Sequence, residues 1–167
     1  MYLSYWGFIT FSALFQMNTT QGSCCLMKKI EYTTSCSKDR LSEIRTFVAG
    51  QLEQLHLSEV EKNQIILAVD EACANAIIHG NNCDDSKSLK LRLEIGNNNL
   101  KVEISDVGNF RPHEMNWTSR EAISDSVRNH RRGGLGLPLI HRIMDKVQFY
   151  SKDKVNVCSL SKRLKKD

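Results

Sequence analysis

Two polar residues, Glu71 and Asn75, lie four positions apart in a segment with the apolar periodicity of a helix. This spacing stacks two side chains on one face of a helix. The same arc holds the small Ala68 and Ala72 and the polar His79, to which we assign no catalytic role, whereas the aliphatic residues gather on the opposite arc. A carboxylate and a carboxamide above small neighbours can hold a hydrated divalent cation and position a general base. Taken alone, the pair is better explained as ordinary surface residues of an amphipathic helix.

A second motif is Ile104-Ser-Asp-Val-Gly108, in which an alternating strand pattern ends in Asp-x-Gly. A carboxylate at the end of a strand, here Asp106, can accept a hydrogen bond from the exocyclic amine of adenine. Gly108 lets the backbone turn tightly and approach a ring. By itself this is also a common strand-to-turn sequence.

A third motif is the glycine-rich segment Arg132-Gly-Gly-Leu-Gly-Leu-Pro138, which precedes an expected helix. Glycines before a helix N-terminus expose backbone N–H groups and the positive end of the helix dipole to phosphate. The segment is not a P-loop, because no Gly-Lys-Ser/Thr follows, and Leu139 stands where a dinucleotide fingerprint has its third glycine. Three glycines in four residues beside Arg131 and Arg132 favour an anion site over a flexible linker.

The bulk properties indicate one globular domain. The chain has 167 residues, 41% hydrophobic and 25% charged, and a net charge of +4 that comes partly from residues 162–166. We interpret this basic tail as a solvated terminus, and no basic helix with interleaved aromatics predicts a nucleic-acid partner. None of the six cysteines forms a CxxC or zinc spacing, which is typical of free thiols in a reducing cytoplasm.

The first residues are expected to lie outside the domain. The apolar stretch 2–15 is too short to span a bilayer and lacks the positive start of a signal peptide, so no membrane association is expected. Met27 is an alternative start. We therefore interpret residues 1–27 as an N-terminal extension that is disordered or not native, and residues 28–167 as the domain.

Periodicity and turn signals predict the elements that must position the three motifs. Ser58 and Glu61 form a capping box, which starts the helix that carries Glu71 and Asn75. The connection 107–132 is long enough to be a functional lid. The expected elements are a strand over 28–34, a helix over 38–55 capped by Ser37, a helix from the capping box to Gly80, strands over 89–95 and 100–104, a helix over 135–145, and strands over 147–151 and 155–160. This order predicts an α+β fold, a two-layer α/β sandwich whose mixed, mostly antiparallel sheet has helices on one face.

Together and in this order, the three motifs resemble the boxes of the GHKL ATPase superfamily, which has the Bergerat nucleotide-binding fold. The stretch Glu71-Ala-Cys-Ala-Asn-Ala-Ile-Ile-His-Gly80 is most similar to the anti-sigma-factor serine/threonine kinase branch, within the histidine kinase-like ATPase domains. Arg-Gly-Gly-Leu-Gly-Leu-Pro-Leu-Ile140 and Met-Asp-Lys-Val147 resemble the same branch. The resemblance covers about residues 28–160. Many relatives have a second glycine two residues after Gly108, where this chain has Phe110.

The resemblance implies the cofactors ATP and Mg²⁺ and a role for each motif. Glu71 would be the catalytic base, Asn75 would bind the metal, and Asp106 with Gly108 would contact adenine. Residues 109–132 would form a lid over the nucleotide. The phosphate-binding residues would be Arg132, Gly133, Gly134, Leu135, Gly136 and Leu137.

The activity implied by the resemblance is that of an ATP-dependent protein serine/threonine kinase that acts as a cytoplasmic anti-sigma factor. Its partners would be a sigma factor, a small antagonist protein with a phosphorylatable serine, and a second copy in a homodimer. One alternative is a non-catalytic ATP-binding module that sequesters a sigma factor or another partner. Another is the catalytic domain of a histidine kinase, although no histidine precedes Lys28 and His113 falls within the expected lid.

Overall fold

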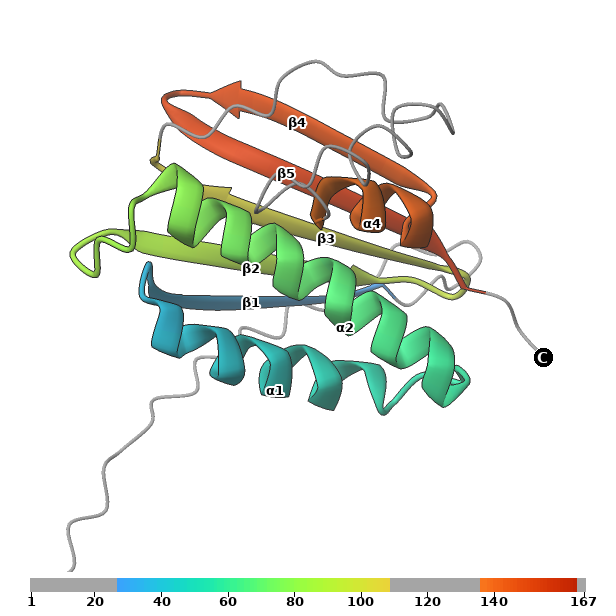
Figure 1. The fold of residues 1–167 in the computed structure, drawn as a ribbon. Coiled ribbons are helices and arrows are strands. Elements are labelled where there is room, and N and C mark those ends of the chain that lie inside the picture. The colour runs from blue at the N-terminus through green and yellow to red at the C-terminus, as the bar shows by residue number, and fades with distance from the viewer. Residues whose placement is uncertain (1–26, 109–135, 165–167) are drawn as a thin grey trace, which may run out of the picture.

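The computed structural model describes residues 27–108 and 136–164, which form an α+β fold. The elements in chain order are β1 (Lys28–Ser35), the 3₁₀ turn η1 (Lys38–Arg40), α1 (Leu41–Leu52), α2 (Glu59–Ala74), the π-helical turn η2 (Asn75–Gly80), β2 (Ser88–Ile95), β3 (Asn99–Asp106), α4 (Gly136–Ile143), β4 (Lys146–Lys152) and β5 (Val155–Arg163). Figure 1 shows α1, α2 and α4 together on one face of the sheet. The predicted two-layer arrangement is confirmed.

The sheet has the strand order β1-β2-β3-β5-β4. Each of its four strand pairs is antiparallel, so the prediction of a mixed sheet is wrong for the described strands. The predicted hairpins, β2 with β3 and β4 with β5, are both present. Strand β5 lies between β3 and β4, and its Asn156 is paired with Asp106 of β3. The end of the Asp-x-Gly strand thus lies in the interior of the sheet and not at its edge.

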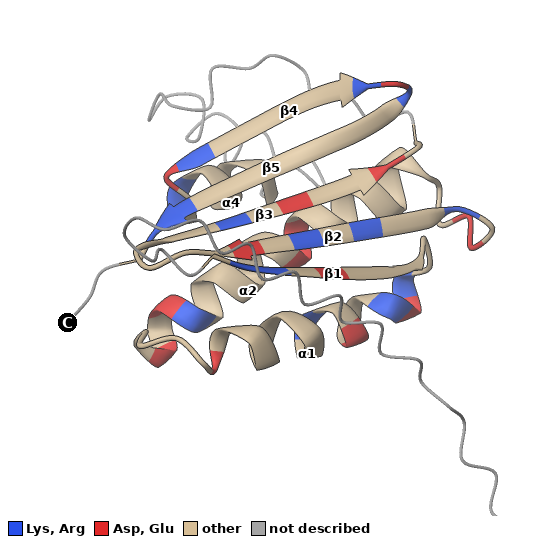
Figure 2. Ribbon diagram, turned by 180° about the vertical axis from the view of Figure 1, so that it is seen from behind, with Lys and Arg blue, Asp and Glu red and all other residues tan. Residues whose placement is uncertain are grey.

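The two faces of the sheet differ in polarity, as the alternation along β2 and β3 predicts. Every second residue of these strands is buried beneath the helices. The residues between them are less buried, and charged residues of both signs lie along the strands (Figure 2). Glu31 pairs there with Lys90 and Arg92, and Glu103 pairs with Lys101. The helix-covered face therefore holds the core.

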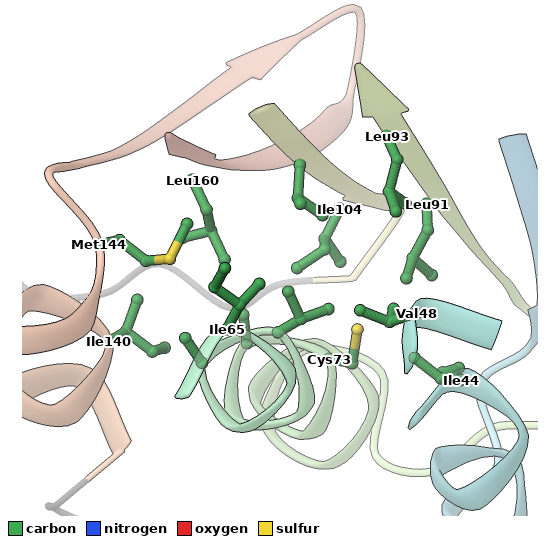
Figure 3. Close-up of a cluster of buried hydrophobic side chains, with 14 of the residues drawn as sticks. Ile44, Val48, Ile65, Cys73, Leu91, Leu93, Ile104, Ile140, Met144 and Leu160 are labelled. Carbon is green, nitrogen blue, oxygen red and sulfur yellow. The ribbon is translucent and has the colours of Figure 1, made fainter. Parts of the chain in front are cut away.

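The core joins all three helices to the sheet. Ile65 and Cys73 of α2, Ile104 of β3, Ile140 of α4 and Leu160 of β5 are at most 1% exposed and meet in one cluster (Figure 3). Cys73 packs here as a small hydrophobe. The described cysteines, Cys36, Cys73, Cys83 and Cys158, are free thiols as expected.

Helix α2 starts as predicted. Oγ of Ser58 accepts from the backbone N–H of Glu61, and the carboxylate of Glu61 accepts from the backbone N–H of Ser58, both at 3.3 Å. The expected side-chain cap at Ser37 is absent: this residue precedes η1 in an extended conformation, and its side chain makes no capping hydrogen bond. The chain thus begins its first helical segment as a 3₁₀ turn.

The burial of α2 differs from the two-arc prediction. Ala68 and Ala72, which the prediction placed on the polar arc, are 0% and 4% exposed, whereas the aliphatic Leu67 is 42% exposed. The reason is that α2 packs against both α1 and α4 in addition to the sheet. Packing on both flanks leaves only a narrow accessible strip, and the small alanines allow close helix contact.

The remaining predictions agree with the described elements to within a few residues. The helix predicted over 135–145 is α4, which begins at Gly136 and ends at Ile143. Among the described helices, none is both long and apolar enough to cross a bilayer. The predicted extension and the predicted lid over 109–132 lie outside the described residues, apart from Met27, which is half exposed.

Candidate functional site

Glu71 and Asn75 lie where α2 passes into η2, and both are partly buried. The predicted shared face is confirmed by their common neighbour, Gly136 at the start of α4. A β-carbon built at Gly136 would lie 2.5 Å from Oε2 of Glu71 and 3.7 Å from Nδ2 of Asn75. The glycine therefore lets the N-terminus of α4 approach both side chains. Residues more than 60 positions apart form one site.

The Glu71 carboxylate has no hydrogen-bond or ion-pair partner among the described residues. The neighbouring Asp70, in contrast, accepts two hydrogen bonds from Arg45 of α1, at 3.0 and 3.1 Å. Two adjacent carboxylates on α2 thus have different surroundings. Asp70 ties α2 to α1, whereas Glu71 can accept a proton or contact a ligand.

The Asn75 carboxamide has an asymmetric environment. Nδ2 is buried and has no hydrogen-bond partner in the described part of the chain. Oδ1 also makes no hydrogen bond with the described residues. Unlike Nδ2, it is not fully buried, so it is the accessible atom of the amide. A neutral oxygen suits Mg²⁺, which retains several waters and takes few protein ligands. The described residues contain no cluster of three His, Cys, Asp or Glu side chains for a cation held by protein alone.

Asp106 lies at the end of β3 and is 7% exposed. Its Oδ1 accepts hydrogen bonds from the backbone N–H of Gly108 at 2.6 Å and from Nδ2 of Asn81 at 3.0 Å. The second oxygen, Oδ2, accepts none from the described residues. Asp106 is therefore a fixed carboxylate with one oxygen available for a ligand.

Gly108 is required by a close approach of two backbone segments. A β-carbon at this position would lie 2.3 Å from the carbonyl oxygen of Gly80 and 2.8 Å from Nδ2 of Asn81. The φ of Gly108 is not in the left-handed region, so the close approach is what requires glycine here. Its carbonyl also accepts a hydrogen bond from Nδ2 of Asn156. The end of β3 is thereby held against the end of η2.

Two thiols lie near the Asp106 carboxylate. Burial, reinforced by the negative charge of Asp106, raises the pKa of Cys158 to about 12. The same two effects raise the pKa of Cys36. Both thiols therefore stay neutral near pH 7, and neither adds charge to the site.

The structure describes only part of the predicted phosphate segment. Gly136 is at the site, and Leu137 is partly buried against the hydrophobic core. The predictions for Arg132, Gly133, Gly134 and Leu135 lie outside the described residues.

Asn81 and Asn156, in contrast, were missed as site residues. The three motifs read from the sequence include neither residue. Alternation along β5 could have placed Asn156 on the face of the sheet that bears Asp106.

Comparison with known proteins bears out the resemblance. The family model of the histidine kinase-like ATPase domain matches residues 34–162. An anti-sigma F factor of Clostridium perfringens is 31% identical over 121 residues, which are 72% of this chain and 85% of the relative. The serine-protein kinase RsbW of Staphylococcus aureus is 29% identical over 144 residues, or 83% of this chain and 88% of the kinase.

Two solved structures share the fold at low sequence identity. One contains the RsbU and RsbW domains of a Mycobacterium tuberculosis protein, with a TM-score of 0.60, 13% identity, and coverage of 84% of this chain and a third (33%) of that longer chain. The other is the SiaB–SiaC complex of Pseudomonas aeruginosa, with a TM-score of 0.57, 14% identity, and coverage of 81% of this chain and 89% of that chain. The chain therefore belongs to the histidine kinase-like ATPase family, as a relative of the anti-sigma F factors and the RsbW serine-protein kinases.

Proposed function

We propose that this chain is an ATP-dependent protein serine/threonine kinase that acts as an anti-sigma factor and phosphorylates a small antagonist protein. Residues 28–167 would be the ATP-binding domain. The family match and the two groups of relatives support this class of function. The single observation that carries it furthest is the close approach of Gly136 to Glu71, because it brings a carboxylate with no partner among the described residues beside a helix N-terminus.

The helix N-terminus is the proposed phosphate site. The first N–H groups of a helix have no partner within the helix, and the dipole makes this end positive. Gly136, at the start of α4, would therefore bind the terminal phosphates of ATP within reach of Glu71 and Asn75. Gly133, Gly134 and Arg132 would complete the anion site, with Leu135 and Leu137 fixing the segment to the domain.

Glu71 is proposed as the general base for the transfer. The hydroxyl oxygen of the acceptor serine would form a bond to the γ-phosphorus as the bond to the bridging oxygen breaks and ADP leaves. The hydroxyl proton would pass to the Glu71 carboxylate, which has no hydrogen-bond or ion-pair partner among the described residues. Oδ1 of Asn75 would ligate Mg²⁺, which supplies positive charge to the phosphates.

Asp106 is proposed as the adenine contact. Oδ1 is occupied by Asn81 and Gly108, which leaves Oδ2 as the acceptor for the exocyclic amine. A 6-oxo purine would present an acceptor at the same place, so the carboxylate would favour adenine over guanine.

Transfer from radiolabelled ATP to a purified antagonist domain tests the proposal. Glu71→Gln should reduce the rate by about 10²–10⁴-fold, the usual contribution of general base catalysis. Asp70→Asn is the matched control: it removes a neighbouring charge on the same helix, where the carboxylate contacts Arg45 and not Gly136. An unchanged rate in Glu71→Gln would refute the base assignment. Nucleotide-dependent complex formation without transfer would support the non-catalytic alternative.

A further inference from the structure

Asn81 is a fully buried polar residue between the nucleotide-contacting strand and the helix of Glu71 and Asn75. It is 0% exposed, and its Nδ2 donates to the carbonyl of Ala76 at 2.8 Å and to Oδ1 of Asp106 at 3.0 Å. Its backbone N–H also donates to the carbonyl of Ala76, at 3.0 Å. One side chain thus joins η2 to the end of β3.

The hydrogen bonds fix the orientation of this amide. Nδ2 has two hydrogens, and both acceptors that it faces, a carbonyl and a carboxylate, lack a proton to donate. Exchanging the amide nitrogen and oxygen would place Oδ1 against two acceptors, so the assignment follows from the network. Oδ1 is left buried and without a partner in the described structure. It is a second oxygen acceptor beside Asp106.

We propose that Asn81 is a positioning residue of the nucleotide site, which holds Asp106 with Oδ2 toward the 6-amino group of a purine and couples this contact to the helix end that bears Glu71 and Asn75. The proposal rests on the assignment of Asp106 in the proposed function. Oδ1 of Asp106 is occupied twice, by Asn81 and Gly108, so the carboxylate cannot rotate without losing a hydrogen bond.

The rest of the surroundings cannot replace the donor that Asn81 provides. Cys36 and Cys158 lie near enough for the Asp106 charge to help raise their pKa values, but neither thiol donates a hydrogen bond to Asp106 in the described structure. Lys87 lies on the Cys36 side but pairs with Asp84 at 3.8 Å. No cation pairs with Asp106 in the described part of the chain, so an amide donor is what orients it.

The test replaces the donor with an acceptor. In Asn81→Asp, a carboxylate oxygen would face Oδ1 of Asp106 at the distance of the present 3.0 Å hydrogen bond. The affinity for ADP, measured by calorimetry, should fall about tenfold or more at pH 8. It should recover toward pH 6, because two close carboxylates take up one proton, which restores a donor to Asp106.

The matched control is Asn82→Asp, which adds the same charge one residue further along the chain. Asn82 is exposed and has a φ of 53°, a conformation that Asp tolerates. This variant should bind ADP like the parent from pH 6 to pH 8. An equal loss at both pH values in a folded Asn81→Asp variant, or the same pH response in Asn82→Asp, would overturn the proposal.

A second variant, Asn81→Ala, gives a readout that a loss of stability alone does not change. It should lower the ratio of ADP to GDP affinity, because Asp106 would keep only the hydrogen bond from Gly108 and would be held less firmly. A parental ratio in the folded variant would overturn the positioning role. If Asp106→Asn binds ADP with parental affinity, the proposed adenine contact itself fails. If Asp106→Asn binds ADP more weakly but the Asn81 variants behave like the parent, the adenine contact stands and the positioning role of Asn81 fails.

Discussion

Gly136→Ala should separate the geometry of catalysis from the stability of the fold. The added methyl carbon would lie 2.5 Å from Oε2 of Glu71, whereas ordinary contacts begin at 3.4 Å, so the carboxylate must move by about 0.9 Å. The end of a flexible side chain can move in this way at little cost. Gly136 begins α4, and alanine is favoured over glycine within helices by about 0.5–1 kcal/mol. The thermal midpoint should therefore stay equal or rise slightly.

The catalytic effect should be much larger. A misplacement of about 1 Å can reduce a rate by roughly 10²-fold. This corresponds to about 2.7 kcal/mol of lost transition-state stabilisation. Single-turnover transfer from ATP to an antagonist domain should show this decrease, while calorimetry should show parental ADP affinity.

A double variant identifies the origin of the loss. If Gly136→Ala acts only through the carboxylate, it should cause no further decrease in a Glu71→Gln background. A parental transfer rate in Gly136→Ala would refute the reasoning. So would a full additional loss in the double variant together with weaker ADP binding, because that result would mean that α4 had moved.

Four further predictions concern stability. Gly108→Ala should lower the free energy of unfolding by about 1–3 kcal/mol, because the carbonyl oxygen 2.3 Å from the new methyl belongs to the backbone of Gly80. Gly50 lies in α1, and a β-carbon added there meets nothing within 4 Å. Gly50→Ala should therefore raise the free energy of unfolding by about 0.5–1 kcal/mol. Equal urea midpoints for this variant and the parent would contradict the packing argument. Because burial raises the pKa of Cys158 from 9.0 to about 12, the folded state disfavours the thiolate, and stability should fall as the pH rises above 9.0. Cys158→Ala should make the decline of the urea midpoint between pH 9 and 10.5 shallower, and parallel profiles would refute this. Ser58→Ala should cost about 1 kcal/mol by removing the cap on α2, and an unchanged thermal midpoint would show that this cap adds nothing.

The predictions from sequence succeed where the signal is local. The alternation along β2 and β3 and the capping box at Ser58 depend on residues within a few positions of each other, and each appears as predicted. The same holds for the face shared by Glu71 and Asn75. Local periodicity cannot show what lies above a helix. The burial of Ala68 and Ala72 was therefore missed, because it depends on α4, which comes more than 60 residues later in the chain.

The reason for Gly108 shows the same limit. From the sequence, Gly108 is expected to approach a ring closely, because glycine has no β-carbon. The sequence could not show that the neighbour is the backbone of Gly80, because two segments distant in the chain meet there. Likewise, the Asn81 to Asp106 hydrogen bond spans 25 positions.

The sequence alone thus determined the kinds of groups available: a carboxylate and a carboxamide on one helix face, a carboxylate at a strand end, and glycines before a helix. These follow from residue type and short-range spacing. The tertiary structure decided which of them meet, by placing Gly136 against Glu71 and Asn81 against Asp106. The physical reason is that contacts between distant segments depend on how the helices and the sheet pack. Those contacts decide which groups a side chain can reach and which of its atoms remain available for a ligand.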